Sequence, residues 1–375
     1  MDASSELIHA LLPLFLVREL GATILAVGLI EGLAEATAAL TKILSGGLSD
    51  RLRRRKVPTL LGYGLAAATK PVFPLAGSLA WICAARFVDR VGKGIRGAPR
   101  DALIADITPP EQRGAAFGLR QSLDSVGAVI GPVAAIVGLR LLDADIRRTL
   151  WIATLPALIA VLVIAFGVRE PTKNEGVPPT RKPWSFFGVR GFSRRFWSVV
   201  VLAAVFTLAR FSEAFLILRA LDLGLSPEQA PLVMVAMNVV YAAFAYPLGR
   251  VADRGSRRGL ALAGLGLLIA ADVVLAAASS AAAVLLGAAL WGLHSACTPG
   301  LFAKWVAEAA PPDRRGQAFG LFHLVSGLAL LLASGLAGLL WSRFGPGATF
   351  AAGAFFAGAA ALGIPAIDRG AARRA

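Results

Sequence analysis

Long apolar runs separated by short polar turns dominate the chain. Many of these runs reach the ~20 residues that an α-helix needs to cross a bilayer. The pattern predicts twelve helices, at about residues 2–18, 23–48, 57–77, 79–101, 114–140, 149–168, 196–219, 228–250, 259–279, 281–304, 316–341 and 347–367. We therefore expect an all-α integral membrane protein in which residues 1–168 and 196–375 form two six-helix bundles, joined by a central cytoplasmic loop at residues 169–195.

A polar phrase occurs twice, 203 positions apart, each time at the end of an apolar run. The copies are Gly46–Arg55 and Gly249–Arg258, and each places an Asp-Arg pair four residues after a glycine, with a second basic pair beyond it. Pro109–Leu119 likewise matches Pro311–Leu321 at an offset of 202. Gly21 and Gly224, which precede the second and eighth helices, are also 203 apart. Repeated halves are an architecture of transporters that place the substrate site near the bilayer midplane.

The composition supports a membrane protein. The chain is 57% hydrophobic and 16% charged, whereas soluble domains carry roughly 25% charged residues. The net charge of +15 does not indicate a nucleic-acid partner, because the basic residues lie in short turns between apolar runs. By the positive-inside rule, the basic turns near residues 51–56 and 254–258 and the central loop are cytoplasmic, and so are both termini. The expected location is a bacterial-type cytoplasmic (inner) membrane.

The first helix is short for its place in the repeat. By comparison with Ser212-Glu213 in the seventh helix, Ser5-Glu6 should lie in the middle of the membrane. We therefore expect about fifteen to twenty further residues upstream of Met1. The alternative is a short first helix that locally thins the bilayer.

Three motifs resemble signatures of the major facilitator superfamily. Gly46–Arg55 is similar to the signature of its loop between helices 2 and 3, with Arg53 in place of the usual second glycine. Arg86-Phe87-Val88-Asp89 is similar to its Arg-x-x-Gln/Asp signature in helix 4, with Arg90 where glycine is common. Gly127–Pro132 resembles the Gly-x-x-x-Gly-Pro signature associated with antiporters, which the eleventh helix lacks.

This resemblance covers nearly the whole chain and implies the superfamily's fold of two pseudo-symmetric bundles. It also implies that the two basic phrases help to hold one closed state. The candidate gating residues are Gly46, Asp50, Arg51, Arg54, Arg55, Gly249, Asp253, Arg254, Arg257 and Arg258. The alternative for these residues is a solvated basic turn that only orients the protein.

Ionisable residues inside the apolar runs are functional candidates, because charges in hydrocarbon are costly. The candidates for the central cavity or for proton coupling are Glu6, Glu31, Glu35, Arg86, Asp89, Arg90, Arg120, Asp124, Arg210 and Glu213. The preferred coupling set is Glu35 or Glu6 with Arg86, and the alternative is a structural ion pair between two helices. Asp272, His294 and His323 are further candidates, although a lone helical histidine is more often a packing residue.

Gly127 and Gly131 are expected to allow close helix packing, and Pro132 to kink the fifth helix. No cofactor and no metal site are expected, since the three histidines and two cysteines form no cluster. The expected function is proton-coupled export of a small molecule by alternating access, with no enzymatic activity and a monomeric protein. The alternatives are import by proton symport, facilitated passage of an organic anion or metal chelate, and, least favoured, a membrane receptor or enzyme.

Overall fold

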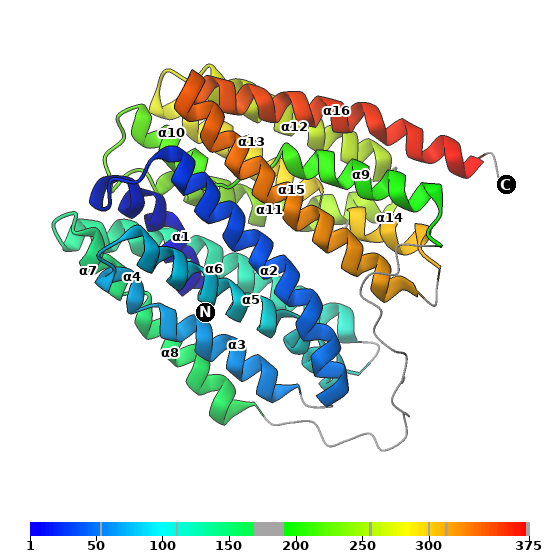
Figure 1. Ribbon diagram of the computed structural model, residues 1–375, viewed down its shortest axis with the longest axis horizontal. Coiled ribbons are helices and arrows are strands. Elements are labelled where there is room, and N and C mark those ends of the chain that lie inside the picture. The colour runs from blue at the N-terminus through cyan, green and yellow to red at the C-terminus, as the bar shows by residue number, and fades with distance from the viewer. Residues whose placement is uncertain are drawn as a thin grey trace. The chain divides into compact units, whose positions relative to one another are not determined.

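The computed structural model describes residues 1–52, 55–109, 112–168, 191–254, 257–298, 301–311 and 314–372. Within these residues the chain is helical and contains no strand. The helices, drawn in Figure 1, are α1 (Asp2–Leu14), η1 (Phe15–Glu19), α2 (Ile24–Leu52), α3 (Lys56–Thr69), α4 (Val72–Leu75), α5 (Leu79–Ile107), α6 (Arg113–Leu141), α7 (Ile146–Trp151), α8 (Thr154–Leu162), η3 (Val163–Gly167), α9 (Arg194–Leu208), α10 (Ala214–Asp222), α11 (Leu232–Arg254), α12 (Arg257–Ala276), α13 (Ala281–Cys297), α14 (Leu301–Ala309), α15 (Arg315–Phe344) and α16 (Pro346–Ala372).

The helices form two compact units. Unit 1 contains Met1–Leu11 and Leu33–Phe186, and unit 2 contains Leu12–Gly32 and Phe187–Ala375. The division falls inside the first two helical regions, so α2 begins in unit 2 and continues into unit 1.

The internal repeat is visible in the backbone. Gly21 and Gly224 have φ angles of 62° and 82°, a left-handed conformation that side chains with a Cβ rarely adopt. Ser78 and Ser280, 202 positions apart, both precede a helix with an extended backbone, at φ −153° and −147°. Equivalent turns before α6 and α15 also close with the same hydrogen bond, from Gln112 N to Pro109 O and from Arg314 N to Pro311 O, each 2.9 Å long. Matched turns at offsets of 202 or 203 residues show that the two halves share their local folding pattern.

Seven helices in the described part of the chain are long and apolar enough to cross a membrane. The remaining expected helices do not meet this criterion, because they are either charged or interrupted. α5 carries charged residues along its second half. The region expected at residues 57–77 is divided into α3 and α4 just before Pro71, which lacks the N–H group for a helical hydrogen bond and disfavours a continuous helix.

The expectation of a continuous seventh helix at residues 196–219 was wrong. α9 ends at Leu208, α10 begins at Ala214, and residues 209–213 between them are not helical. The tenth helix is interrupted too, because α13 ends at Cys297 and α14 begins at Leu301. Hydropathy averaged over about 20 residues does not resolve either interruption, because each spans only a few residues between longer apolar runs, although the sequence Thr298-Pro299-Gly300 at the second is a turn signal.

The signature glycines of α6 lie against α1 within unit 1. A Cβ at Gly131 would come within 2.7 Å of Ala3 O and Leu7 N, and one at Gly127 within 3.0 Å of the Asp2 Cβ. The two helix backbones therefore approach closely here, as the sequence predicted for these glycines. This contact holds the acidic side of α1, with Asp2 and Glu6, beside α6.

Two arginines close helix ends that lie far from them in sequence. In unit 2, Arg219 donates to Leu275 O at 3.1 Å and to Ala278 O at 2.7 Å, beyond the last turn of α12, and it also pairs with Asp222. In unit 1, Arg147 donates to Pro74 O at 2.9 Å and to Ala76 O at 2.8 Å, at the end of α4. The carbonyls at a helix end lack partners inside the helix, so these bonds satisfy groups that would otherwise be buried unpaired.

Replacing Arg219 with leucine should destabilise the protein by about 2–4 kcal/mol, because buried carbonyls lose a charged donor. The matched control is Arg148→Leu, since Arg148 pairs with Asp145 at an exposed position where such a pair contributes at most about 1 kcal/mol. Thermal unfolding in detergent should show a clearly lower midpoint for Arg219→Leu than for the control. Equal midpoints would contradict a stabilising role for these bonds.

Candidate functional site

A buried charged face of α5 forms the centre of unit 1. Arg86, Asp89 and Arg90 are each 4% exposed or less, although all three are ionisable. Asp89 accepts a hydrogen bond from the ammonium of Lys70 at 2.8 Å, and Lys70 is only 1% exposed. Arg86 and Arg90 approach the other oxygen of Asp89, at 4.0 and 3.7 Å. One carboxylate therefore lies among three cations.

Carboxylates from α1 and α2 join this face. Glu35 lies 2.9 Å from Arg90 and 3.9 Å from the ammonium of Lys93. Glu6 lies 3.4 Å from His9 Nδ1 on the next turn of α1. The preferred coupling set consisted of Glu35 or Glu6 with Arg86. The structure places Glu35 against Arg90, and Arg86 approaches Asp89.

A second group of charges continues along α5 toward Ile107. Arg96 lies 3.5 Å from Asp2, and its guanidinium lies over the Tyr63 ring at 4.5 Å from the centroid. On α6, Arg120 pairs with Asp124 at 2.8 Å, as their four-residue spacing predicted. Asp124 also lies 4.0 Å from Arg100, and Arg120 lies 3.9 Å from Asp101, so the network connects α1, α2, α3 and α6 to α5 inside the unit.

Most of the predicted gating residues lie outside the described side chains. These are Gly46, Asp50, Arg51, Arg54, Asp253, Arg254 and Arg257. Of the others, Arg55 pairs with Asp106 at 3.2 Å, and Arg258 is exposed. Gly249 has open space where a Cβ would stand. The gating role of these residues stays a prediction.

The remaining predicted residues divide between two environments. Glu31 on α2 is buried, at 1% exposure, while Glu35 one turn later is partly exposed. Arg210 and Glu213 lie in the non-helical segment between α9 and α10 and line a cavity of unit 2. Pro132 lies inside the continuous helix α6.

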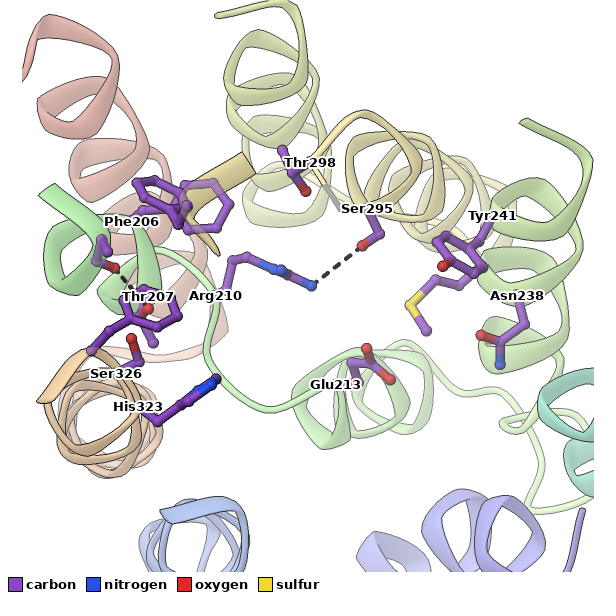
Figure 2. A pocket seen from close by; sticks show the side chains of 14 residues that line it. Phe206, Thr207, Arg210, Glu213, Asn238, Tyr241, Ser295, Thr298, His323 and Ser326 are labelled. Atoms are coloured by element: carbon purple, nitrogen blue, oxygen red, sulfur yellow. Dashed lines mark hydrogen bonds between the residues drawn. The ribbon is translucent and has the colours of Figure 1, made fainter. Parts of the chain in front are cut away.

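The cavity in unit 2 has a volume of about 560 Å³ (Figure 2). Its lining comes from α9, the segment after it, α11, α13, the start of α14 and α15. The lining residues are Ala203, Phe206, Thr207, Arg210, Glu213, Met237, Asn238, Tyr241, Ser295, Thr298, Phe302, Phe322, His323 and Ser326. Aromatic rings, hydroxyl groups and two opposite charges therefore face one space, which is typical of a site for a small organic molecule.

Arg210 has few partners in this cavity. Its Nη2 lies 3.5 Å from Ser295 Oγ, at the limit of a hydrogen bond, and its guanidinium lies 5.7 Å from the Phe206 ring centroid. Its buried Nε has no hydrogen-bond partner among the described residues. Figure 2 shows the side chain extended between Thr207 and Ser295, with Glu213 just before the start of α10.

Two further ionisable residues of unit 2 are fully buried. His294 donates from Nδ1 to Gly264 O at 2.7 Å, which fits the packing role expected for a helical histidine. Asp272 is 0% exposed, and neither carboxylate oxygen has a hydrogen-bond partner among the described residues. Asp272 lies against Gly353, because a Cβ at Gly353 would come within 2.5 Å of its carboxylate and within 3.0 Å of the Phe211 ring.

The sequence analysis missed Lys70 and His9. A lysine inside an apolar run carries the same signal that selected Arg86, because any charge at membrane depth requires a partner. The hydroxyl residues of the cavity carry no such signal, since serine and threonine are common in membrane helices.

Comparisons with known proteins identify relatives over the whole chain. A family model described as Major Facilitator Superfamily matches residues 1–218 and 214–371. An uncharacterised MFS-type transporter of Methanocaldococcus jannaschii is 30% identical over 364 residues, which is 95% of this chain and 89% of that protein. The multidrug resistance protein MdtH of Yersinia pestis is 29% identical over 162 residues, which is 43% of this chain and 38% of that protein. Among solved structures, a POT family transporter in complex with a thioalcohol-conjugated peptide is similar in fold, with a TM-score of 0.81 over 99% of this chain and 94% of that chain, at 14% identity.

Replacing Asp89 with asparagine should destabilise the protein by about 3–5 kcal/mol, because Lys70 would keep a buried charge without its carboxylate. The double variant Lys70→Met, Asp89→Asn should recover much of this loss, since no unpaired ammonium remains. Asp106→Asn is the matched control, because it breaks the more exposed pair with Arg55. Thermal unfolding of the four proteins tests the expectation, and a loss for Asp89→Asn no larger than that of the control would contradict it.

Proposed function

Because the chain belongs to the major facilitator superfamily of transporters, we propose that it is a secondary active transporter that works by alternating access and exports a small molecule in exchange for protons. It acts as a monomer in the cytoplasmic membrane, with both termini in the cytoplasm. The basic phrases around Asp50 and Asp253 close its cytoplasmic side.

The observation that carries proton coupling is the position of Glu35 on the charged face of α5. Glu35 pairs with Arg90 at 2.9 Å and has Lys93 at 3.9 Å, and its side chain is 32% exposed. A carboxylate in contact with cations favours its ionised form, and it takes up a proton more readily when those cations move away. A helix rearrangement that changes the distance from Glu35 to Arg90 would therefore couple proton binding to the conformation of the protein.

Two observations support export. The segment Gly127–Pro132 resembles the antiporter-type signature, and its two glycines lie closely against α1 beside the acidic residues of that helix. The similarity to the multidrug resistance protein MdtH agrees with this direction, although it covers less than half of the chain.

The alternative is a proton symporter or a facilitator for an organic anion or a metal chelate. It is favoured by the guanidinium of Arg210 in the cavity of unit 2, which a carboxylate could neutralise. The direction of proton movement relative to the transported molecule distinguishes this alternative from export by antiport.

Replacing Glu35 with glutamine should abolish proton-driven transport and preserve exchange of substrate for substrate. Glutamine retains the shape of the side chain but cannot take up a proton. We would reconstitute the protein in proteoliposomes containing a pH-sensitive dye, impose a pH gradient, and screen a panel of organic cations, anions and zwitterions. A transported compound should move protons in the opposite direction through the wild type, and only counterflow exchange should remain in Glu35→Gln.

Glu19→Gln is the matched control, because Glu19 is an exposed glutamate at the end of η1. It should keep the wild-type proton flux. Proton movement in the same direction as the substrate would show that the protein is a symporter and would contradict the proposed antiport. Unchanged proton flux in Glu35→Gln would remove this residue from the coupling step.

A further inference from the structure

The cavity of unit 2 contains two opposite charges at one interruption of the helical backbone. Arg210 and Glu213 lie between α9 and α10, three residues apart, and both line the cavity. Tyr241 and His323 also line the cavity. When these two side chains are neutral and Arg210 and Glu213 are ionised, the charges of the lining sum to zero.

The guanidinium of Arg210 has donors to spare. Arginine carries five N–H donors, and a planar carboxylate is the group that matches two of them at once. Here one nitrogen has a long contact of 3.5 Å with Ser295, and the buried Nε has no partner among the described residues. Buried polar groups are normally hydrogen-bonded, so this cation is poised for an anionic group inside the cavity.

The rest of the cavity wall suits an apolar body. Phe206 and Phe302 pack together with ring centroids 4.8 Å apart, and Phe322 lines the same space. Aromatic walls of this kind bind the flat face or edge of an apolar group.

We infer that this cavity binds a small zwitterionic solute with an apolar, preferably aromatic, body, whose acidic group lies at Arg210 and whose amine lies at Glu213. This assignment rests on the proposed function, since it names the class of molecule that the transporter carries.

A solute with a single charge fits the cavity less well. An anion alone would neutralise Arg210 but would add a negative charge beside Glu213, and a cation alone would do the reverse. A singly charged solute would leave either Arg210 or Glu213 without a counter-charge from the ligand, whereas a zwitterion supplies one to each.

Three compounds with one body test the inference. They are L-phenylalanine, 3-phenylpropionate, which lacks the amine, and 2-phenylethylamine, which lacks the carboxylate. Binding of radiolabelled phenylalanine to the purified full-length protein in detergent, with the other two as competitors, gives three affinities. We expect phenylalanine to bind at least about tenfold more tightly than either analogue, the effect of one hydrogen bond to a charged group.

Variants then assign each charge to its wall. In Arg210→Gln, phenylalanine should lose about tenfold to hundredfold in affinity and should bind no better than 2-phenylethylamine. In Glu213→Gln, it should bind no better than 3-phenylpropionate. Arg343→Gln is the matched control, because Arg343 is exposed in the last turn of α15 and lies outside the cavity lining, and it should leave all three affinities unchanged. If Arg210 or Glu213 had only a structural role, its replacement would lower the affinity for all three compounds by the same factor.

Several results would overturn the inference. Tight binding of 3-phenylpropionate that does not depend on Glu213 would make the site an anion site, and the converse result would make it a cation site. Absence of binding by all three compounds, in a protein that elutes as a single folded species, would also overturn it. The assay needs no proton gradient, so the expected binding pattern without proton-driven transport would contradict the proposed antiport and leave the assignment of the cavity intact.

Discussion

Ionised side chains inside a membrane must find their partners within the protein, and this constraint organises unit 1. Arg86, Asp89 and Arg90 are buried in the protein, so their partners come from neighbouring helices. Lys70 reaches Asp89 from the end of α3, and Glu35 reaches Arg90 from α2. Once these pairs form, α5 cannot rotate or slide without separating charges at a cost of several kcal/mol. The same network that fixes the helices is therefore the part most sensitive to any rearrangement between them.

The duplicated halves have divided these roles between them. With the helix starts at Ser78 and Ser280 in register, Lys93 of α5 corresponds to Ser295 of α13, and Arg96 corresponds to Thr298. The first half carries cations at these positions, while the second carries hydroxyl groups that line a cavity. One scaffold thus produces a closely packed ionic network in unit 1 and an open space of about 560 Å³ in unit 2.

The sequence predicted the helical architecture and the register of the repeat, because both depend on local patterns. Hydropathy locates the helices, and the left-handed glycines Gly21 and Gly224 recur at the spacing that the motifs indicated. The same analysis selected the charged residues of α5 by their cost in hydrocarbon. It did not predict that Glu35 pairs with Arg90. Three cations of α5, which are Arg86, Arg90 and Lys93, lie within about two turns, and only the helix packing selects among them. It did select Arg210 and Glu213, which line the cavity of unit 2, but it did not identify the other lining residues, because their meeting depends on how the helices pack.

The interruption between α9 and α10 shows how an irregular backbone can persist at membrane depth. Two amide groups there are satisfied by side chains, since Ser212 N donates to Ser334 Oγ at 3.1 Å and Ala214 N donates to Ser212 Oγ at 3.2 Å. Phe211 packs against Trp291 and Phe350, with ring centroids 5.3 and 5.6 Å away, and so anchors the segment on its apolar side. Non-helical backbone in a membrane protein is tolerated where it is buried in protein or lines a cavity, and this segment meets both conditions. The residues that remain for the cavity are Arg210 and Glu213, at either end of the segment, so the interruption itself determines that two opposite charges face the same space.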